Sequence, residues 1–146
     1  MSRVLLPVDP DQPARTRSAV EQVLRMRQTG PVTVRLLRVQ PKVSGHVAML
    51  FGAAELRELQ LSAGAEDLQF AQKLLELAGV PYQSTVLVGR SAETIVEAAR
   101  DYHCDRIVFG SDPASFAGKI FGSLAQQVRQ MLEAGGDGAD PQVIGS

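Results

Sequence analysis

The sequence predicts an α/β fold, a doubly wound and mostly parallel five-stranded sheet with helices on both faces. Short apolar segments alternate with segments of helical periodicity along the chain, which is the pattern of a parallel sheet covered by helices. A length of 146 residues suits a single domain with a real core, and we expect residues 1–146 to form one. Hydrophobic residues make up 45% of the chain and charged residues 21%, which excludes a disordered or fibrous protein.

The expected strand order is the Rossmann-like 3-2-1-4-5. Right-handed crossovers wind such a sheet on both faces, and the order reverses after the first strand. A crevice then opens between the carboxyl ends of strands one and four. Asp9 and Gly110 follow these two strands, so we expect them to face each other across the crevice.

The first third of the chain predicts two strands and a helix between them. Residues 4–8 form an apolar run that ends in the turn-forming residues 9–13, as is typical of a strand that enters a loop. From Ala14, apolar residues recur at helical spacing until Gly30-Pro31, which indicates an amphipathic helix. Residues 32–39 are rich in β-branched and aliphatic side chains and predict the second strand.

Residues 43–54 have no clear period and predict a surface connection. We expect three of its side chains, His46, Met49 and Phe51, to pack back on the sheet.

A long helical stretch is expected over residues 55–78, with a break at Gly64. Gly79 stands where a C-cap glycine belongs. Residues 82–88 predict the third strand.

The next helix is expected to begin with Ser91 as its N-cap and Glu93 in its first turn. Its buried face is formed by Ile95, Val96, Ala98, Ala99 and Tyr102.

The last part of the chain predicts a fourth strand over residues 106–109 and a final helix from Ile120. Residues 134–146 are expected to be a mobile glycine-rich tail, in which residues 141–144 can form a short last strand.

Charge and composition limit the partners that we expect. The net charge of -1 is far from that of a dedicated nucleic-acid binder, so no nucleic-acid partner is predicted. Residues 1–45 nevertheless carry eight Arg or Lys against three acidic residues, a balance of +5 that leaves -6 for the rest. This imbalance indicates either a basic face or the solvated sides of one helix and one strand, and the lack of interleaved aromatic residues favours the second.

The remaining composition suits a cytoplasmic protein. Neither a signal peptide nor an apolar run of membrane-spanning length is evident, so no membrane partner is expected. Cys104 is the single cysteine, which excludes an internal disulfide and a multi-cysteine metal site and suits a reducing compartment. His46 and His103 have no metal-like spacing and are interpreted as surface or packing residues, and no metal is expected.

Common nucleotide-binding signatures are absent. No Gly-x-Gly-x-x-Gly follows the first strand, and Gly118-Lys119 is followed by Ile120 where a P-loop requires Ser or Thr. Residues 109–123 nevertheless form a loop of small residues between a strand and a helix. Such a loop can offer backbone N–H groups to a phosphate, or its glycines can simply satisfy a turn.

The order of motifs resembles the universal stress protein family over nearly the whole chain. The resemblance rests on Pro7-Val8-Asp9 after the first strand, residues 36–39 in the second, and residues 107–111 with Gly122-Ser123 beyond the fourth. Nucleotide-binding members of that family carry Gly, two residues, Gly, nine residues, then Gly followed by Ser or Thr. Here Pro113 replaces the second glycine, and only eight residues separate it from Gly122. The loop is one residue short and lacks the main-chain N–H at Pro113.

The resemblance implies a degenerate ATP site between strands one and four. It assigns Asp9 to the nucleoside, Val39 to the wall beside the adenine, and Gly110, Gly122 and Ser123 to the phosphates. Pro7, Val8 and Phe109 would shape the pocket. Two of these residues have simpler interpretations, because Asp9 can cap a turn before Pro10 and Ser123 can cap the final helix.

The function implied is that of a stress-response or regulatory protein, acting as a homodimer and without turnover. The alternative is a dimeric interaction module of the same fold that binds no nucleotide. A nucleotide hydrolase or transferase is disfavoured, since Asp112 is the one acidic residue in the phosphate loop. Cys104 is interpreted as a buried inert thiol in preference to a thiolate beside His103, and Arg90 as a solvated loop residue in preference to a phosphate ligand.

Overall fold

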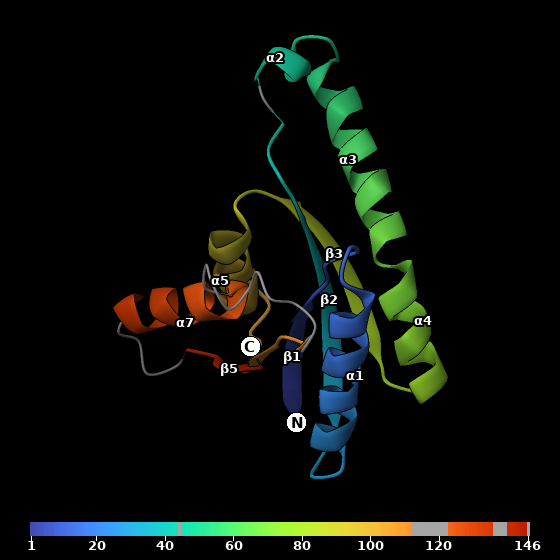
Figure 1. Cartoon of the computed structure of the whole chain (residues 1–146), viewed down its shortest axis with the longest axis vertical. Helices are drawn as coiled ribbons and strands as arrows, with labels where there is room; N and C mark the ends of the chain where they lie inside the picture. Colours follow the sequence, from blue (N-terminus) through green and yellow to red (C-terminus); the bar gives the residue numbers. More distant parts are fainter. Residues whose placement is uncertain (44, 112–122, 136–139, 146) are drawn as a thin grey trace.

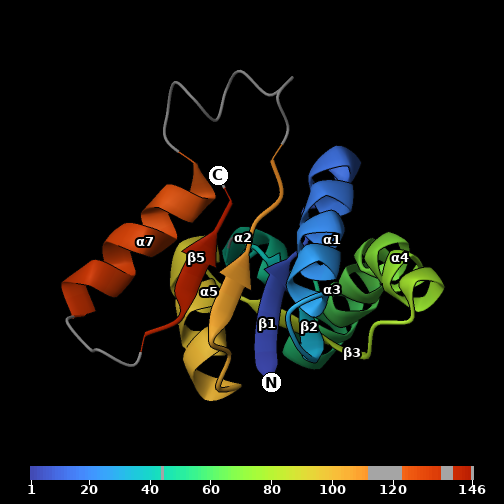
Figure 2. The same cartoon turned by 90° about the horizontal axis from the view of Figure 1, so that it is seen from below.

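The computed structural model describes residues 1–43, 45–111, 123–135 and 140–145. Their strands form one sheet in the order β3-β2-β1-β4-β5, and every neighbouring pair is parallel (Figure 2). The strands are β1 (Ser2–Pro7), β2 (Val32–Gln40), β3 (Tyr82–Val88), β4 (Arg106–Val108) and β5 (Gln142–Ile144). The predicted α/β class, strand order and parallel pairing are confirmed.

Helices cover both faces of this sheet (Figures 1 and 2). One face carries α1 (Pro13–Arg27), α3 (Ala53–Asp67) and α4 (Gln69–Ala78). The other carries α5 (Ser91–Asp101) and α7 (Leu124–Gly135). Among the described helices, none is long and apolar enough to cross a membrane.

Alternation along β1 divides the interior into two cores. Val4 and Leu6 belong to the core under α1 and α4, whereas Leu5 belongs to the core under α5 and α7. Since successive side chains of a strand point to opposite faces, one short strand supplies both cores. All three side chains are 1% exposed or less, as expected for the middle strand of a covered parallel sheet.

The long helical stretch is divided at Leu68 and not at Gly64, so the predicted break was wrong. Leu68 is buried and lies between α3 and α4, and its N–H donates to the Ala65 carbonyl oxygen at 3.3 Å. Gly64 lies inside α3, where a Cβ would stand 2.4 Å from Val86 Cγ1. This glycine lets α3 approach β3 closely. Gly79 has φ 69° at the end of α4, which confirms the predicted left-handed C-cap.

The three side chains of residues 43–54 that we expected to pack back on the sheet do not. This segment includes the short helix α2 (Gly45–Ala48), and His46, Met49 and Phe51 are all exposed. Helix α3 is anchored near its C-terminal half, where Gln40 Nε2 donates to the Gln60 carbonyl oxygen at 3.2 Å. Its N-terminal end and α2 therefore extend beyond the strands (Figure 1), out of reach of the core.

Helix α5 begins one residue earlier than predicted. Arg90 is its N-cap, no side chain caps it, and Ser91 is already helical, so the Ser91 cap was wrong. The N–H of Gly89 still bonds the Gln40 carbonyl oxygen at 3.0 Å, so the sheet hydrogen bonding continues to that residue and the chain turns directly into the helix. Glu93 lies in the first turn, as predicted. Of the predicted buried face, Ile95, Val96, Ala98 and Ala99 are buried and Tyr102 is half-buried.

The end of the chain forms the predicted strand as β5 on β4. Residues 134 and 135, expected in the glycine-rich tail, belong instead to the end of α7. Residues 136–139 lie outside the described residues, as does the predicted helix start at Ile120.

We predict that Gly64→Ala destabilises the protein through its clash with Val86. Overpacking costs about 1–3 kcal/mol, from which the better helix propensity of Ala recovers up to about 1 kcal/mol. In a Val86→Ala background the same change should become neutral or stabilising, because the clashing methyl groups are gone. Urea unfolding of the four proteins of this cycle measures the coupling, and equal effects in both backgrounds would contradict the close approach.

Candidate functional site

A cavity of about 380 Å³ opens at the carboxyl ends of β1, β2 and β4. Six predicted site residues line it: Pro7, Val8, Asp9, Val39, Phe109 and Gly110. Gly122 lies outside the described residues, together with Pro113 and most of the phosphate loop. Ser123 does not line the cavity, although Leu124 and Ala125 directly after it do. The predicted crevice is present, with Asp9 and Gly110 on its walls.

Asp9 forms the turn that carries the chain from β1 to α1. Its Oδ1 accepts the N–H of Asp11 at 3.0 Å, and its carbonyl oxygen accepts the N–H of Gln12 at 3.0 Å. The predicted turn cap is therefore present. Because an ionised carboxylate can accept about four hydrogen bonds, Asp9 keeps acceptor capacity for a ligand in the cavity.

Val39 and Phe109 give the cavity an apolar wall. They are 7% and 8% exposed and belong to the core under α5 and α7. Val8 fixes the adjoining edge, because its N–H donates to the Leu37 carbonyl oxygen at 2.8 Å just beyond the last residue of β1. A planar apolar group can lie against such a wall, which is the usual composition of small-molecule pockets.

Gly110 is required by a close backbone contact. A Cβ at this position would lie 1.6 Å from the Arg15 carbonyl oxygen in the first turns of α1. Just beyond it, the N–H of Ser111 donates to Ser18 Oγ at 3.1 Å, which fastens the chain after β4 to the same helix. The structural role of this glycine is therefore explicit, and it coincides with a position on the cavity wall.

Ser123 caps helix α7, as the simpler interpretation predicted. Its Oγ accepts the N–H of Gln126 at 3.1 Å. The N-terminal end of α7 borders the cavity at Leu124 and Ala125. A helix N-terminus carries partial positive charge and unpaired N–H groups, so this border favours an anion.

Sequence reasoning missed the charged residues of the cavity, Asp11, Arg15 and Arg38. Arg38 Nε pairs with Asp67 Oδ2 at 3.0 Å, which ties the end of β2 to α3. Arg15 lies in the first turn of α1, directly after the loop that Asp9 opens. Sequence reasoning could have found Arg15 from its place in the first turn of the helix after the first strand, because such a helix begins at the carboxyl edge of the sheet.

Other candidate chemical groups lie elsewhere. Arg90 pairs weakly with Glu93 at 3.8 Å and its side chain is 83% exposed, in agreement with a solvated loop arginine. His103 is exposed, and Cys104 is buried. Burial raises the pKa of the Cys104 thiol, which keeps it protonated near neutral pH. Over the part of the chain that the structure describes, no three His, Cys, Asp or Glu side chains gather as metal ligands would.

Comparison with known proteins decides the family. The family model described as the universal stress protein family matches residues 1–132. The chain belongs to the universal stress protein family. No curated protein matched this chain in a search of their sequences.

Solved universal stress proteins share this fold at low sequence identity. One from Archaeoglobus fulgidus is 23% identical, with a TM-score of 0.63 over 99% of this chain and 97% of that one. One from Arabidopsis thaliana, solved with AMP bound, is 18% identical, with a TM-score of 0.64 over 99% and 91% of the two chains. An Archaeoglobus fulgidus structure in complex with dAMP is 22% identical, with a TM-score of 0.56 over 99% and 96%.

We predict that Gly110→Ala destabilises this universal stress protein without any ligand, by about 1–3 kcal/mol or more. The clashing atom is a backbone oxygen, so no change of rotamer relieves it. Gly30→Ala is the matched control, since nothing lies within 4 Å of a Cβ at that position. Urea unfolding without nucleotide compares the two variants, and an unfolding free energy equal to that of the control would contradict the close contact.

Proposed function

We propose that this universal stress protein is a stress-response regulator that binds an adenine nucleotide in the cavity at the carboxyl ends of β1, β2 and β4. The observation that carries the proposal is the convergence of Asp9, Val39 and Gly110, from three different strand ends, on one cavity. In open α/β sheets, ligands usually bind at the carboxyl ends of the strands, at the point where the strand order reverses. The AMP and dAMP bound to the two related structures support the same ligand class.

The cavity supports one orientation of the nucleotide. The adenine lies against the apolar wall of Val39 and Phe109, where it loses contact with water. Asp9 accepts hydrogen bonds from the ribose hydroxyl groups. The phosphates extend toward Gly110 and the N-terminus of α7, where N–H groups and partial positive charge compensate their negative charge.

We expect weak binding and no turnover. Pro113 removes one N–H that the family pattern places at the phosphates, and a lost hydrogen bond to a charged group costs about 1.5–3 kcal/mol. The acidic residues that line the cavity, among those described, are Asp9 and Asp11, and the bond between them closes the turn. The proposed role is therefore regulation through nucleotide-dependent contacts, and ATP incubated with the protein should release no phosphate above background.

We predict that Asp9→Ala weakens ATP binding about tenfold to a hundredfold, through the loss of charge-assisted hydrogen bonds. Asp9→Asn distinguishes the loss of a ligand contact from the loss of the turn. Its amide oxygen can still accept the Asp11 N–H, while the negative charge is lost. Both variants should bind ATP more weakly, and Asp9→Ala should also melt at a lower temperature. Asp101→Ala is the control, an exposed acidic residue at the end of α5. Calorimetry with unchanged ATP affinity in Asp9→Ala would reject the assignment.

A second function, a dimeric interaction module, is favoured by the edge strand β5. Its Gln142 N–H and Ile144 carbonyl oxygen bond to β4 through Asp105 and Phe109, at 3.0 and 2.7 Å. In a ladder these groups alternate sides, so the N–H and carbonyl of Val143 point away from β4, toward the outer edge. A three-residue edge strand that turns backbone groups outward is suited to pairing with a second copy.

We predict a homodimer at micromolar concentration that Val143→Pro converts to a monomer. Proline removes the outward N–H of β5 and spares the bonds to β4, whereas Val143→Thr keeps the N–H and the β-branched shape and should remain dimeric. Light scattering of the three proteins measures the mass. A monomeric parent protein, or a dimeric Val143→Pro variant, would contradict pairing through this edge.

A further inference from the structure

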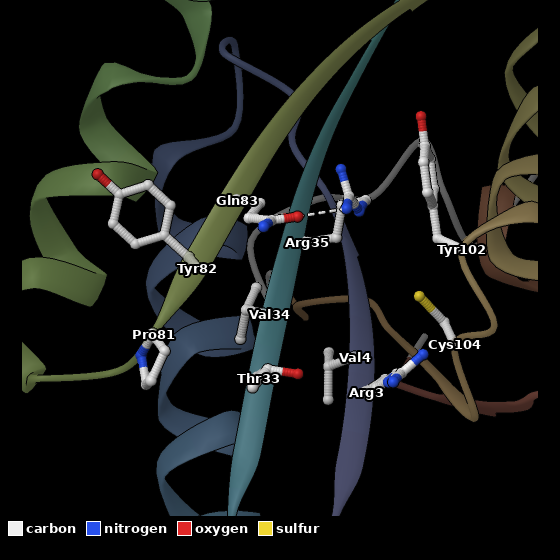
Figure 3. Close-up of a pocket in the computed structure, with 10 residues that line it drawn as sticks. All are labelled: Arg3, Val4, Thr33, Val34, Arg35, Pro81, Tyr82, Gln83, Tyr102 and Cys104. Atoms are coloured by element: carbon white, nitrogen blue, oxygen red, sulfur yellow. Dashed lines mark hydrogen bonds between the residues drawn. The ribbon is translucent and has the colours of Figure 1, made fainter.

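A second cavity, of about 400 Å³ (Figure 3), lies at the amino ends of β1, β2 and β3, whereas the candidate nucleotide site lies at the carboxyl ends of the strands. It is formed by the first halves of β1, β2 and β3 and the residues that follow α5. The side chains that matter here are Arg3, Thr33, Arg35, Gln83, Tyr102 and Cys104. Neither the family match nor the proposed function accounts for it.

Arg35 is held in place on the sheet surface. Its register partner on β1 is Leu5, a member of the core under α5 and α7, so Arg35 emerges on that face. Its guanidinium lies over the Tyr102 ring, 3.9 Å from the ring centre, and Nη1 donates to Thr85 Oγ1 at 2.9 Å. Nη2 donates to Gln83 (Figure 3). Because a guanidinium has five N–H donors, further donors remain for a ligand, in a fixed orientation.

Arg3 brings a second positive charge to the same cavity. It is two residues before Leu5 on β1 and therefore lies on the same face as Arg35. Figure 3 shows its side chain on the Cys104 side of the cavity. Burial raises the pKa of the Cys104 thiol, and the positive charges of Arg35 and Arg3 oppose this rise.

No carboxylate lines this cavity among the residues that the structure describes. The acidic group nearest in the chain is Asp105, which is exposed, raises the pKa of Cys104, and accepts the backbone N–H of Arg3 at 2.9 Å. Other arginines of the basic first third have partners outside the cavity, such as Arg38 with Asp67 and Arg27 with the Ala78 carbonyl oxygen. Arg3 and Arg35 are thus two cations that share one cavity.

We infer that this cavity binds a small polyanion, with oxyanion groups on the guanidinium groups of Arg3 and Arg35. Arg35 is half-buried and Arg3 is exposed. Their like charges repel each other, and a ligand with two anionic groups removes this repulsion while it gains charge-assisted hydrogen bonds. Thr33 adds a hydroxyl to the same lining. Phosphate and carboxylate groups share this chemistry, because both match the planar fork of arginine.

Equilibrium dialysis with radiolabelled inorganic pyrophosphate tests the inference, with the ionic strength held constant by potassium chloride. We expect the parent protein to retain pyrophosphate, and Arg3→Gln to weaken retention about tenfold or more, the effect of losing one charge-assisted contact. Arg57→Gln is the matched control, since it removes the same charge from an exposed position on α3. Arg35→Gln is the second variant and should weaken retention at least as strongly.

Competition by citrate distinguishes a phosphate ligand from a polycarboxylate ligand. Displacement of pyrophosphate by an equal concentration of citrate indicates a polycarboxylate ligand, and continued retention indicates a phosphate ligand. The inference is overturned if the parent protein retains no pyrophosphate at millimolar concentration. It is also overturned if Arg3→Gln and Arg35→Gln, both folded by circular dichroism, retain pyrophosphate as well as Arg57→Gln does. Failure of Asp9→Ala to alter ATP binding would not affect this result, because Asp9 lies at the other cavity.

Discussion

Strand β1 must be buried on both faces at once, with Leu5 in one core and Val4 and Leu6 in the other. Backbone groups of a strand that is covered on both faces cannot bond to water, so β1 needs a hydrogen-bonded neighbour on each edge, and β2 and β4 occupy these positions. The connection that leaves β1 runs toward β2 and the one that leaves β4 runs toward β5, so the chain leaves these two neighbouring strands in opposite directions at their carboxyl ends. The cavity that Asp9 and Gly110 line follows from this divergence, and so does the placement of α1 and α7 on opposite faces of the sheet (Figure 2).

The fold could be predicted because its information is local and periodic. Residues 82–88 were predicted and observed as a strand, and Gly79 was predicted and observed as a left-handed C-cap. The helix break could not be predicted in the same way. Gly64 has low helix propensity, yet it is retained within α3 because the packing against Val86 requires the absence of a Cβ. Here a contact with a strand that is distant in the sequence outweighs the local helix propensity, and no sequence pattern within the helix indicates that contact.

The candidate site likewise contains residues that sequence reasoning found and residues that it missed. Asp9 and Gly110 were accessible to sequence reasoning because they follow two strands that the topology brings together, and the family resemblance added Pro7, Val8 and Phe109. Arg15 and Arg38 were missed because they lie within elements, where side-chain direction depends on register. The pair of Arg3 and Arg35 was visible only as part of a charge imbalance. The contact of Arg35 with Tyr102 joins β2 to the end of α5, and this tertiary contact distinguishes a fixed cation from a solvated one.

Gly110 shows why a structural role and the proposed ligand-binding role can occupy one position without conflict. The end of β4 can approach α1 closely enough to place its backbone on the cavity wall only if no Cβ meets the Arg15 carbonyl oxygen. The same closeness allows Ser18 to bond the N–H of Ser111 and fixes the direction in which the chain leaves the strand. A residue that must lack a side chain for packing also presents bare backbone to whatever enters the cavity. The packing of α1 on β4 therefore creates the bare backbone surface that the proposed phosphate contact requires.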